Sequence, residues 1–127
     1  MGSNATTSRS GRWGVMKLCR LLVLAPLLWL CSACGGPLAQ GVHAYDHGRY
    51  PEALERLYCA ETDTRTWRGA DRARYALYRG LVHLALGDRQ ATLRWLGEAK
   101  QAWDADRTLL SDEEGNRLAS AWAHLPP

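Results

Sequence analysis

Histidine and cysteine are the side chains of this sequence best suited to chemistry, and two histidines stand at a spacing that metal sites use. His43 and His47 are four residues apart, so on a helix both imidazoles would share one face. Zinc sites need further ligands, and no acidic or cysteine third ligand is evident nearby. We therefore interpret both residues as solvated histidines and predict no metal site.

The other candidate groups have structural explanations. His83 lies between Val82 and Leu84, which favours packing over catalysis. The chain has no Gly-rich phosphate loop, zinc-protease pair, nucleophile elbow or paired Cys-x-x-Cys motifs. The acidic run 112–114 follows Ser111 as in a capping box, so helix capping explains its carboxylates. We predict that the protein is not an enzyme and needs no cofactor.

The first 33 residues have the order of a secretory signal. Lys17 and Arg20 precede a ten-residue apolar run at 21–30, and the small residues Ser32 and Ala33 follow it. A membrane-spanning helix needs about 20 apolar residues, and Pro26 lies inside this shorter run. We predict a cleaved signal segment at 1–33, with Met1 or Met16 as the start of translation.

The end of this segment, Leu30-Cys31-Ser32-Ala33-Cys34, resembles the lipobox of bacterial lipoproteins. The resemblance implies cleavage before Cys34 and acylation of that cysteine, with residues 34–36 as a short flexible tether. Two or more acyl chains hold a protein on a membrane durably, whereas one chain binds marginally. In this family an Asp after the cysteine is associated with inner-membrane retention. Gly35 therefore implies the periplasmic face of an outer membrane.

The basic charge of the chain belongs to its N-terminal segment. Four of the 16 Lys and Arg residues and none of the 13 Asp and Glu residues precede Cys34. The 94 residues from Cys34 onward are nearly neutral, which argues against nucleic-acid binding. Cys59 would be the only free thiol of the processed chain. We predict that it is a buried apolar residue, with an intermolecular disulfide as the alternative.

Beyond Cys34 the apolar periodicity predicts an all-α fold. Glycine and proline mark the expected helix ends, and Gly80 is expected to admit a close neighbouring helix. We expect five helices. The first covers 37–47, the second begins at Pro51 and fades at Glu61, and the third covers 70–86. The fourth follows Gly87, and the fifth covers 111–124. Their expected apolar stripes are Ala53, Leu54, Leu57 and Ala60; Ala73, Ala76, Leu77, Gly80, Leu81 and Leu84; Leu93, Leu96, Ala99 and Trp103; and Leu118, Ala121, Trp122 and Leu125.

An internal repeat appears when the chain is shifted by 39 residues against itself. The shift places Gly41 on Gly80, Gly48 on Gly87, Leu57 on Leu96 and Ala60 on Ala99. The segment 44–54, with Gly48 as a helix stop, Tyr50 at the turn and Ala53 at a close contact, resembles a tetratricopeptide repeat. The segment 78–88 keeps the glycines of that pattern. The resemblance implies two antiparallel helical hairpins within a domain at 37–127, with a capping helix at 111–124.

The repeat register also implies a binding surface. In this family the first helix of each hairpin lines a concave groove that holds peptides. The groove residues would be Val42, Tyr45, Asp46, Arg74, Leu77 and Tyr78. Equally, so short a stack could bury these residues beneath the helix at 111–124.

We therefore expect a membrane-anchored, non-catalytic adaptor or assembly factor of the bacterial envelope. Its partner would be a protein or peptide, in a role accessory to a secretion, pilus or outer-membrane assembly machine. The alternative is a structural lipoprotein that associates with itself, because a short helical array leaves an uncovered face at each end. An enzyme or metal-binding protein built on the histidines or Cys59 is the third and weakest reading.

Overall fold

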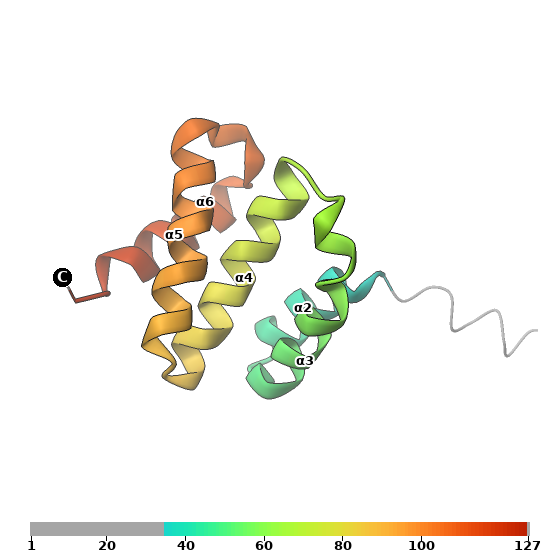
Figure 1. Ribbon diagram of the computed structural model, residues 1–127. Helices are drawn as coiled ribbons and strands as arrows, with labels where there is room; N and C mark the ends of the chain where they lie inside the picture. The colour runs from blue at the N-terminus through green and yellow to red at the C-terminus, as the bar shows by residue number, and fades with distance from the viewer. Residues whose placement is uncertain (1–34, 127) are drawn as a thin grey trace, which may run out of the picture. The chain divides into compact units, whose positions relative to one another are not determined.

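The computed structural model describes residues 35–126, and this part of the chain is entirely helical (Figure 1). The all-α prediction is therefore confirmed for these residues, which contain no strand. The predicted signal segment at 1–33 and the lipid site at Cys34 lie outside the described residues. The elements are α2 (Pro37–Asp46), α3 (Tyr50–Ala60), the 3-10 helix η2 (Asp63–Arg65), α4 (Ala70–Leu86), α5 (Arg89–Ala105), the 3-10 helix η3 (Arg107–Leu109) and α6 (Asp112–Ala123).

Glycine ends the first and third of these α-helices as the sequence predicts. Gly48 and Gly87 adopt φ values of 70° and 79°, a left-handed conformation that only glycine adopts without strain. The turn beyond α2 is closed by a hydrogen bond from the amide of Arg49 to the carbonyl of Ala44, at 2.9 Å. The turn beyond α4 has the equivalent bond, from Asp88 to His83, at 3.0 Å. Both turns reverse the chain, so α3 packs back on α2 and α5 on α4.

The same glycine–leucine contact recurs in each of these helix pairs, 39 residues apart. A Cβ atom built on Gly41 would lie 2.8 Å from Leu57 Cδ2, and one built on Gly80 would lie 2.5 Å from Leu96 Cδ2. Both glycines therefore let a leucine of the following helix approach the backbone. The prediction of a close neighbour at Gly80 is confirmed, and the repeat seen in the sequence corresponds to a repeated packing contact.

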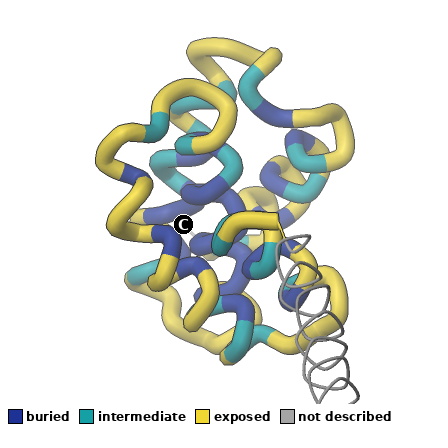
Figure 2. Tube along the Cα trace, turned by 90° about the vertical axis from the view of Figure 1, so that its right-hand side faces the viewer, coloured by how far each residue is buried: buried dark blue, intermediate teal, exposed yellow. Residues whose placement is uncertain are grey.

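Helix α4 is the centre of the core, between α5 on one side and the α2–α3 pair on the other (Figure 1). Buried residues follow the inward sides of the helices, and exposed residues gather in the connections (Figure 2). Tyr75 is fully buried and forms edge-to-face contacts with Trp67 and Trp95, with ring centroids 5.9 and 5.6 Å apart. Such pairs stabilise a core beyond the area that they bury.

Three predicted stripes are wrong at one position each. Leu93 of α5 and Leu84 of α4 are both 39% exposed and Trp122 of α6 is 37% exposed, although each was expected to pack. Helix α5 instead buries Thr92, Trp95 and Leu96. The physical reason is that periodicity identifies the apolar positions of a helix, whereas the neighbouring helices decide which of them are covered.

The prediction that Cys59 is buried is also wrong. Its thiol is free and exposed, and the adjacent Tyr58 is half exposed. Helix α3 faces its neighbours through Ala53, Leu57 and Ala60, all completely buried. Successive residues of a helix lie about 100° apart, so Cys59 points away from that face. An intermolecular disulfide through this thiol stays a prediction.

The capping box that starts the last helix is confirmed. The Ser111 hydroxyl accepts a hydrogen bond from the Glu114 amide, and the Glu114 carboxylate accepts one from the Ser111 amide, both at 3.2 Å. Gly115 in the first turn of α6 has a packing role. A Cβ atom there would lie 2.7 Å from Trp103 Cζ2 of α5, so glycine makes room for the indole. This contact fixes the start of α6 against α5.

Candidate functional site

A groove open to solvent runs between α2, α4 and α6, with a volume of about 840 Å³. Tyr45 of α2, Leu81 and Leu84 of α4, and Ala121 of α6 give it an apolar floor. The polar wall comes from α6 and the residue that follows it, and consists of Glu113, Asn116, Arg117, Ser120 and His124. A smaller hollow of about 140 Å³ shares Leu84 and His124 with the groove, and extends it toward Leu125.

The groove exists because α6 covers only part of the apolar face of α4. Along this face Leu77 is fully buried, Leu81 is 5% exposed and Leu84 is 39% exposed. These residues are four and three positions apart, so they follow one another on the same side of the helix. The last turn of α4 therefore offers an apolar side chain that residues 35–126 cover only in part.

Ion pairs hold α6 in place across the groove. Arg117 donates to Asp46 of α2 at 2.7 Å and to Glu113 of its own helix at 2.6 Å. These hydrogen bonds, the one to Asp46 first, raise the pKa of Arg117 above its ordinary value. Arg74 of α4 donates to Glu114 of α6 at 2.6 Å. Partly exposed pairs of this kind stabilise a protein modestly, by about 1 kcal/mol or less, but they fix the orientation of α6.

The structure brings one of the six predicted partner-binding residues into the groove. Tyr45 lines it, whereas Asp46 and Arg74 are engaged in the ion pairs with α6. The remaining three, Val42, Leu77 and Tyr78, are at most 7% exposed. These placements agree with the alternative in which the helix at 111–124 covers the surface. Direct binding of a partner by these residues stays a prediction.

The binding surface predicted from the sequence lies about one helical turn of α4 away from the groove, at Leu77 and Tyr78 instead of Leu81 and Leu84. Leu81 and Leu84 continue the face of Leu77, but both were assigned to packing. The whole α6 wall was treated as a cap. The available signal was that the apolar stripe of α4 continues past Leu77 to Leu81 and Leu84.

The tyrosines beside the groove form a cluster of neutral rings. Tyr45 lies edge-on to Tyr78 with centroids 5.5 Å apart, and Tyr50 is 5.6 Å from Tyr45 on its other side. Burial raises the pKa of both Tyr45 and Tyr78 above 10. Both phenols therefore stay protonated at physiological pH and offer flat apolar surface with a polar edge.

The groove wall contains no activated nucleophile. Ser120 and His124 are neighbours on α6, but His124 Nδ1 is 2.7 Å from the backbone oxygen of Ser120. A serine nucleophile would need its hydroxyl, not its carbonyl, within reach of the imidazole. The arrangement is suited to binding an amphipathic segment.

The two histidines with metal-ligand spacing lie together on α2. The ring centroids of His43 and His47 are 4.2 Å apart, and His47 Nδ1 is 2.8 Å from the His43 carbonyl oxygen. Both side chains are exposed, as predicted. Residues 35–126 hold no group of three or more His, Cys, Asp or Glu side chains placed to bind a metal ion.

His83 is buried, at 6% exposure, which confirms the packing role predicted for it. Burial is the main cause that lowers its pKa below 6.5, and the charge of Arg79 acts in the same direction. The Asp88 carboxylate, 3.6 Å from His83 Nδ1, opposes this shift. The folded protein therefore favours the neutral imidazole.

We expect this histidine to make folding stability depend on pH. Because its pKa is lower in the folded chain, the unfolded chain takes up the proton first as the pH falls. The stability due to neutral His83 is complete above about pH 6.5, the unfolded pKa, and is lost as the pH falls toward the folded pKa. Urea unfolding measures the free energy of unfolding at pH 7.5 and 5.5. The decrease between these pH values should be smaller for His83→Phe than for the unmodified chain. Between pH 7.5 and 8.5 both should change alike, and equal losses at low pH would contradict the assignment.

No helix within residues 35–126 combines the length and the apolar character needed to cross a membrane. Comparison of the chain with protein-family models, with curated proteins and with solved structures found no match.

Proposed function

We propose that this protein is a membrane-tethered, non-catalytic adaptor that binds a segment of a partner protein in the groove between α2, α4 and α6. The observation that carries the proposal is the partly exposed apolar face of α4 at Leu84, next to a polar wall. Exposed apolar surface rimmed by polar groups is typical of protein interaction sites. The groove is open rather than enclosed, which favours a peptide over a small molecule.

The groove chemistry defines the kind of segment that fits. Leu81, Leu84 and Ala121 would pack against apolar side chains of the partner. Asn116 and Ser120 on the wall can exchange hydrogen bonds with polar side chains or with the partner backbone. The occupant is therefore a short amphipathic segment, apolar on one side and polar on the other.

The repeated contacts support a fold of two tetratricopeptide-like hairpins with α6 as the cap. Each helix pair has a glycine–leucine contact and a left-handed glycine stop at the same relative position. In such a stack the first helices and the cap, here α2, α4 and α6, line one side. These are the helices that contribute the groove.

The proposed tether is a lipid on Cys34, at the end of a signal segment that is removed. Acyl chains at this position would hold the domain at the periplasmic face of the outer membrane. Residues 34–36 would then place the groove within reach of envelope proteins. We propose a role beside an assembly machine of the envelope, such as one for secretion, for pili or for outer-membrane proteins.

Photo-crosslinking in the native cells tests the groove. A photoreactive amino acid at position 84 should give an adduct with one partner protein, because that side chain faces the groove. The matched control is position 86 in the same turn of α4, which is 43% exposed and does not line the groove. The partner adduct should be at least several times weaker there.

The other outcomes contradict the adaptor. An adduct of twice the chain's own mass from position 84 would instead support the self-associating structural lipoprotein. Equal adducts from both positions would show that exposure rather than the groove determines the contact. Absence of any adduct from position 84 would overturn binding in the groove.

A further inference from the structure

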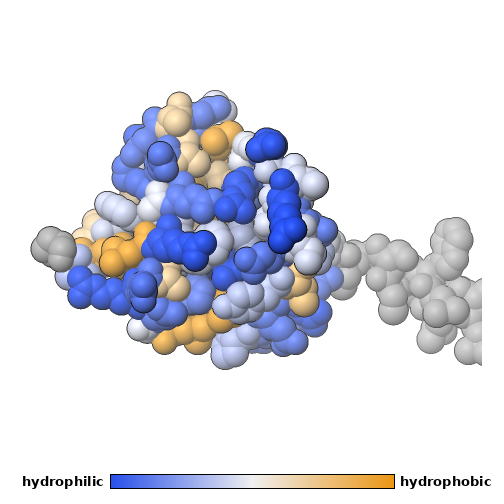
Figure 3. Space-filling model, viewed as in Figure 1, coloured by the Kyte–Doolittle hydropathy of each residue, from blue (hydrophilic) through white to orange (hydrophobic). Residues whose placement is uncertain are grey.

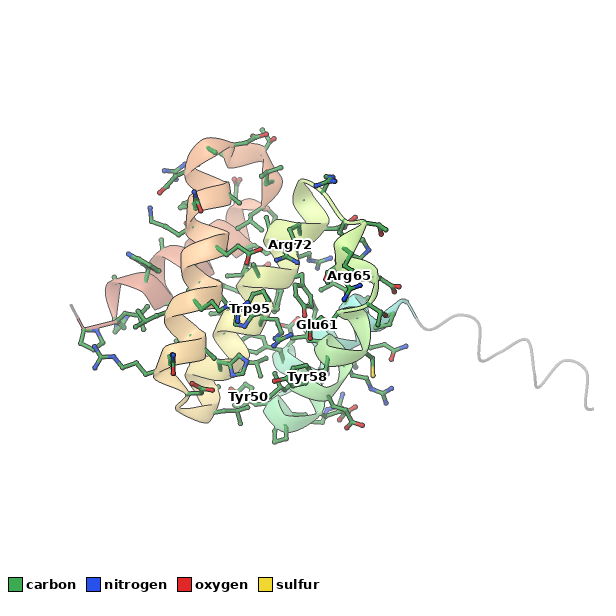
Figure 4. The ribbon with its side chains drawn as sticks, in the orientation of Figure 1. Tyr50, Tyr58, Glu61, Arg65, Arg72 and Trp95 are labelled. Carbon is green, nitrogen blue, oxygen red and sulfur yellow. The ribbon has the colours of Figure 1, made fainter. Side chains whose placement is uncertain are left out.

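A second cleft opens between α3 and α5, above the face of α4 that is not part of the groove. Its volume is about 390 Å³. Tyr58 of α3 and Glu61, the residue that follows α3, line one side, and Trp95 of α5 lines the other (Figure 4). The face of the molecule seen in this orientation is mainly hydrophilic, with separate apolar patches (Figure 3). Arg79 and His83 of α4, one helical turn apart, also line the cleft.

Arg79 is a buried charge with an unused donor. Its side chain is 5% exposed and its guanidinium lies 4.3 Å from the Tyr58 ring centroid and 4.5 Å from that of Trp95. Nη1 donates to the Tyr75 hydroxyl. Nε is buried and has no hydrogen-bond partner among the described residues. An unpaired donor of a charged group is costly to bury, so this guanidinium is predisposed to accept an anionic partner.

The cleft already contains a carboxylate that is loosely held. Glu61 Oε2 lies 3.5 Å from Arg79 Nη1, which is too long for a good charged hydrogen bond, and the Glu61 side chain is half exposed. The position of this carboxylate shows that an anionic oxygen can lie beside the Arg79 guanidinium. It can swing into solvent when a better-placed anion enters.

His83 supplies a second unused group beside Arg79. Its Nε2 atom is buried and finds no hydrogen-bond partner within residues 35–126, while Nδ1 is 3.6 Å from Asp88. When the ring is protonated, Nε2 becomes a donor. Arg94 of α5 lines the same cleft and adds positive charge. The charged side chains of the cleft are therefore the cations Arg79 and Arg94 and the carboxylates Glu61 and Asp88.

We propose that this cleft binds a small oxyanion of the carboxylate or phosphate class, held by Arg79 and His83 in place of Glu61. Tyr58 and Trp95 flank the guanidinium and leave its in-plane donors for the ligand. Such planar donor edges recognise carboxylate and phosphate oxygens in particular. This inference stands apart from the peptide groove, because the two sites share no lining residue.

The test is an NMR titration of the full-length protein with sodium phosphate, sodium acetate and sodium chloride at matched ionic strength. The Arg79 Nε–H and Trp95 indole N–H signals should shift in a saturable way with phosphate, with acetate or with both. The arm that saturates identifies the class of oxyanion.

Glu61→Gln and Glu55→Gln form a matched pair for this titration. Both remove one negative charge from α3, but the exposed Glu55 does not line the cleft. Loss of the competing carboxylate should tighten binding about fivefold for Glu61→Gln, and Glu55→Gln should change it by less than about twofold. Arg79→Met should abolish the saturable shift of Trp95 in a protein whose circular dichroism remains helical.

Two results would overturn the proposal. One is a chloride titration that reproduces every shift, which would leave only an ionic-strength effect. The other is an equal response of Glu61→Gln and Glu55→Gln, which would assign the binding to the overall charge. If Arg79→Met does not fold, Arg94→Gln against Arg89→Gln decides in its place, since only Arg94 lines the cleft. Weaker binding in Arg94→Gln alone would support the proposal.

Discussion

Replacing Gly80 with alanine is expected to destabilise the protein by about 2 kcal/mol, although alanine is the better helix former. The new methyl group would lie 2.5 Å from Leu96 Cδ2 and 2.8 Å from the Leu96 backbone nitrogen. A side chain can rotate away, but the backbone of α5 can relieve the second contact only by moving the helix. Because α4 and α5 form the largest helix contact of residues 35–126, that movement would disturb the core.

Gly97→Ala is the matched control for this prediction. At Gly97 an added Cβ atom would meet only Trp122, at 3.9 Å, which is ordinary contact. Alanine there should stabilise the protein by about 0.5–1 kcal/mol, through the lower conformational freedom of the unfolded chain. Urea unfolding followed by tryptophan fluorescence measures both variants. Changes of the same sign in the two would show that the close contact at Gly80 does not control stability.

Replacing Cys34 with alanine is expected to leave nearly all of the protein uncleaved and without acyl chains. Each buried methylene group of an acyl chain contributes roughly 0.8 kcal/mol to membrane binding, so losing every chain removes the lipid anchor and leaves only the apolar run at 21–30 to contact a membrane. The variant also lacks the residue at which the signal segment would be processed. It should therefore retain residues 1–33, which intact mass spectrometry would detect.

Cys59→Ala provides the control for the tether. Cys59 is exposed on α3, and its replacement removes a thiol without touching the proposed lipid site. This variant should remain in the membrane fraction with the mass of the acylated chain. An unmodified chain whose intact mass includes residues 1–33 and no acyl group on Cys34 would contradict the lipid tether.

The parts of this fold that depend on nearby residues could be predicted from the sequence. The stops at Gly48 and Gly87 and the capping box at Ser111 each involve groups within about five residues of one another. Gly80 was identifiable because a glycine within an apolar helical stripe usually marks a close approach. The 39-residue repeat then indicated where the equivalent contact lies in the other helix pair.

The parts that depend on distant residues could not be predicted in this way. Cys59 and Leu93 are residue types typical of packed positions, but within residues 35–126 no helix covers their side of α3 or α5. The groove required knowing how far α6 extends over α4, which is set in part by the Asp46–Arg117 pair between residues 71 positions apart. The meeting of Arg79 with Tyr58 and Trp95 likewise joins three helices.

The most direct test of the adaptor compares Leu84→Lys with Leu86→Lys, using a photoreactive amino acid at Ser120 on the groove wall. Both substitutions place a lysine in the last turn of α4, where a cation suits the helix end and both leucines are already exposed. Only Leu84 contributes to the groove floor. Losing an apolar contact of this size should reduce the partner adduct about tenfold or more in Leu84→Lys, and Leu86→Lys should retain it. An adduct of equal strength in both variants would contradict binding in the groove.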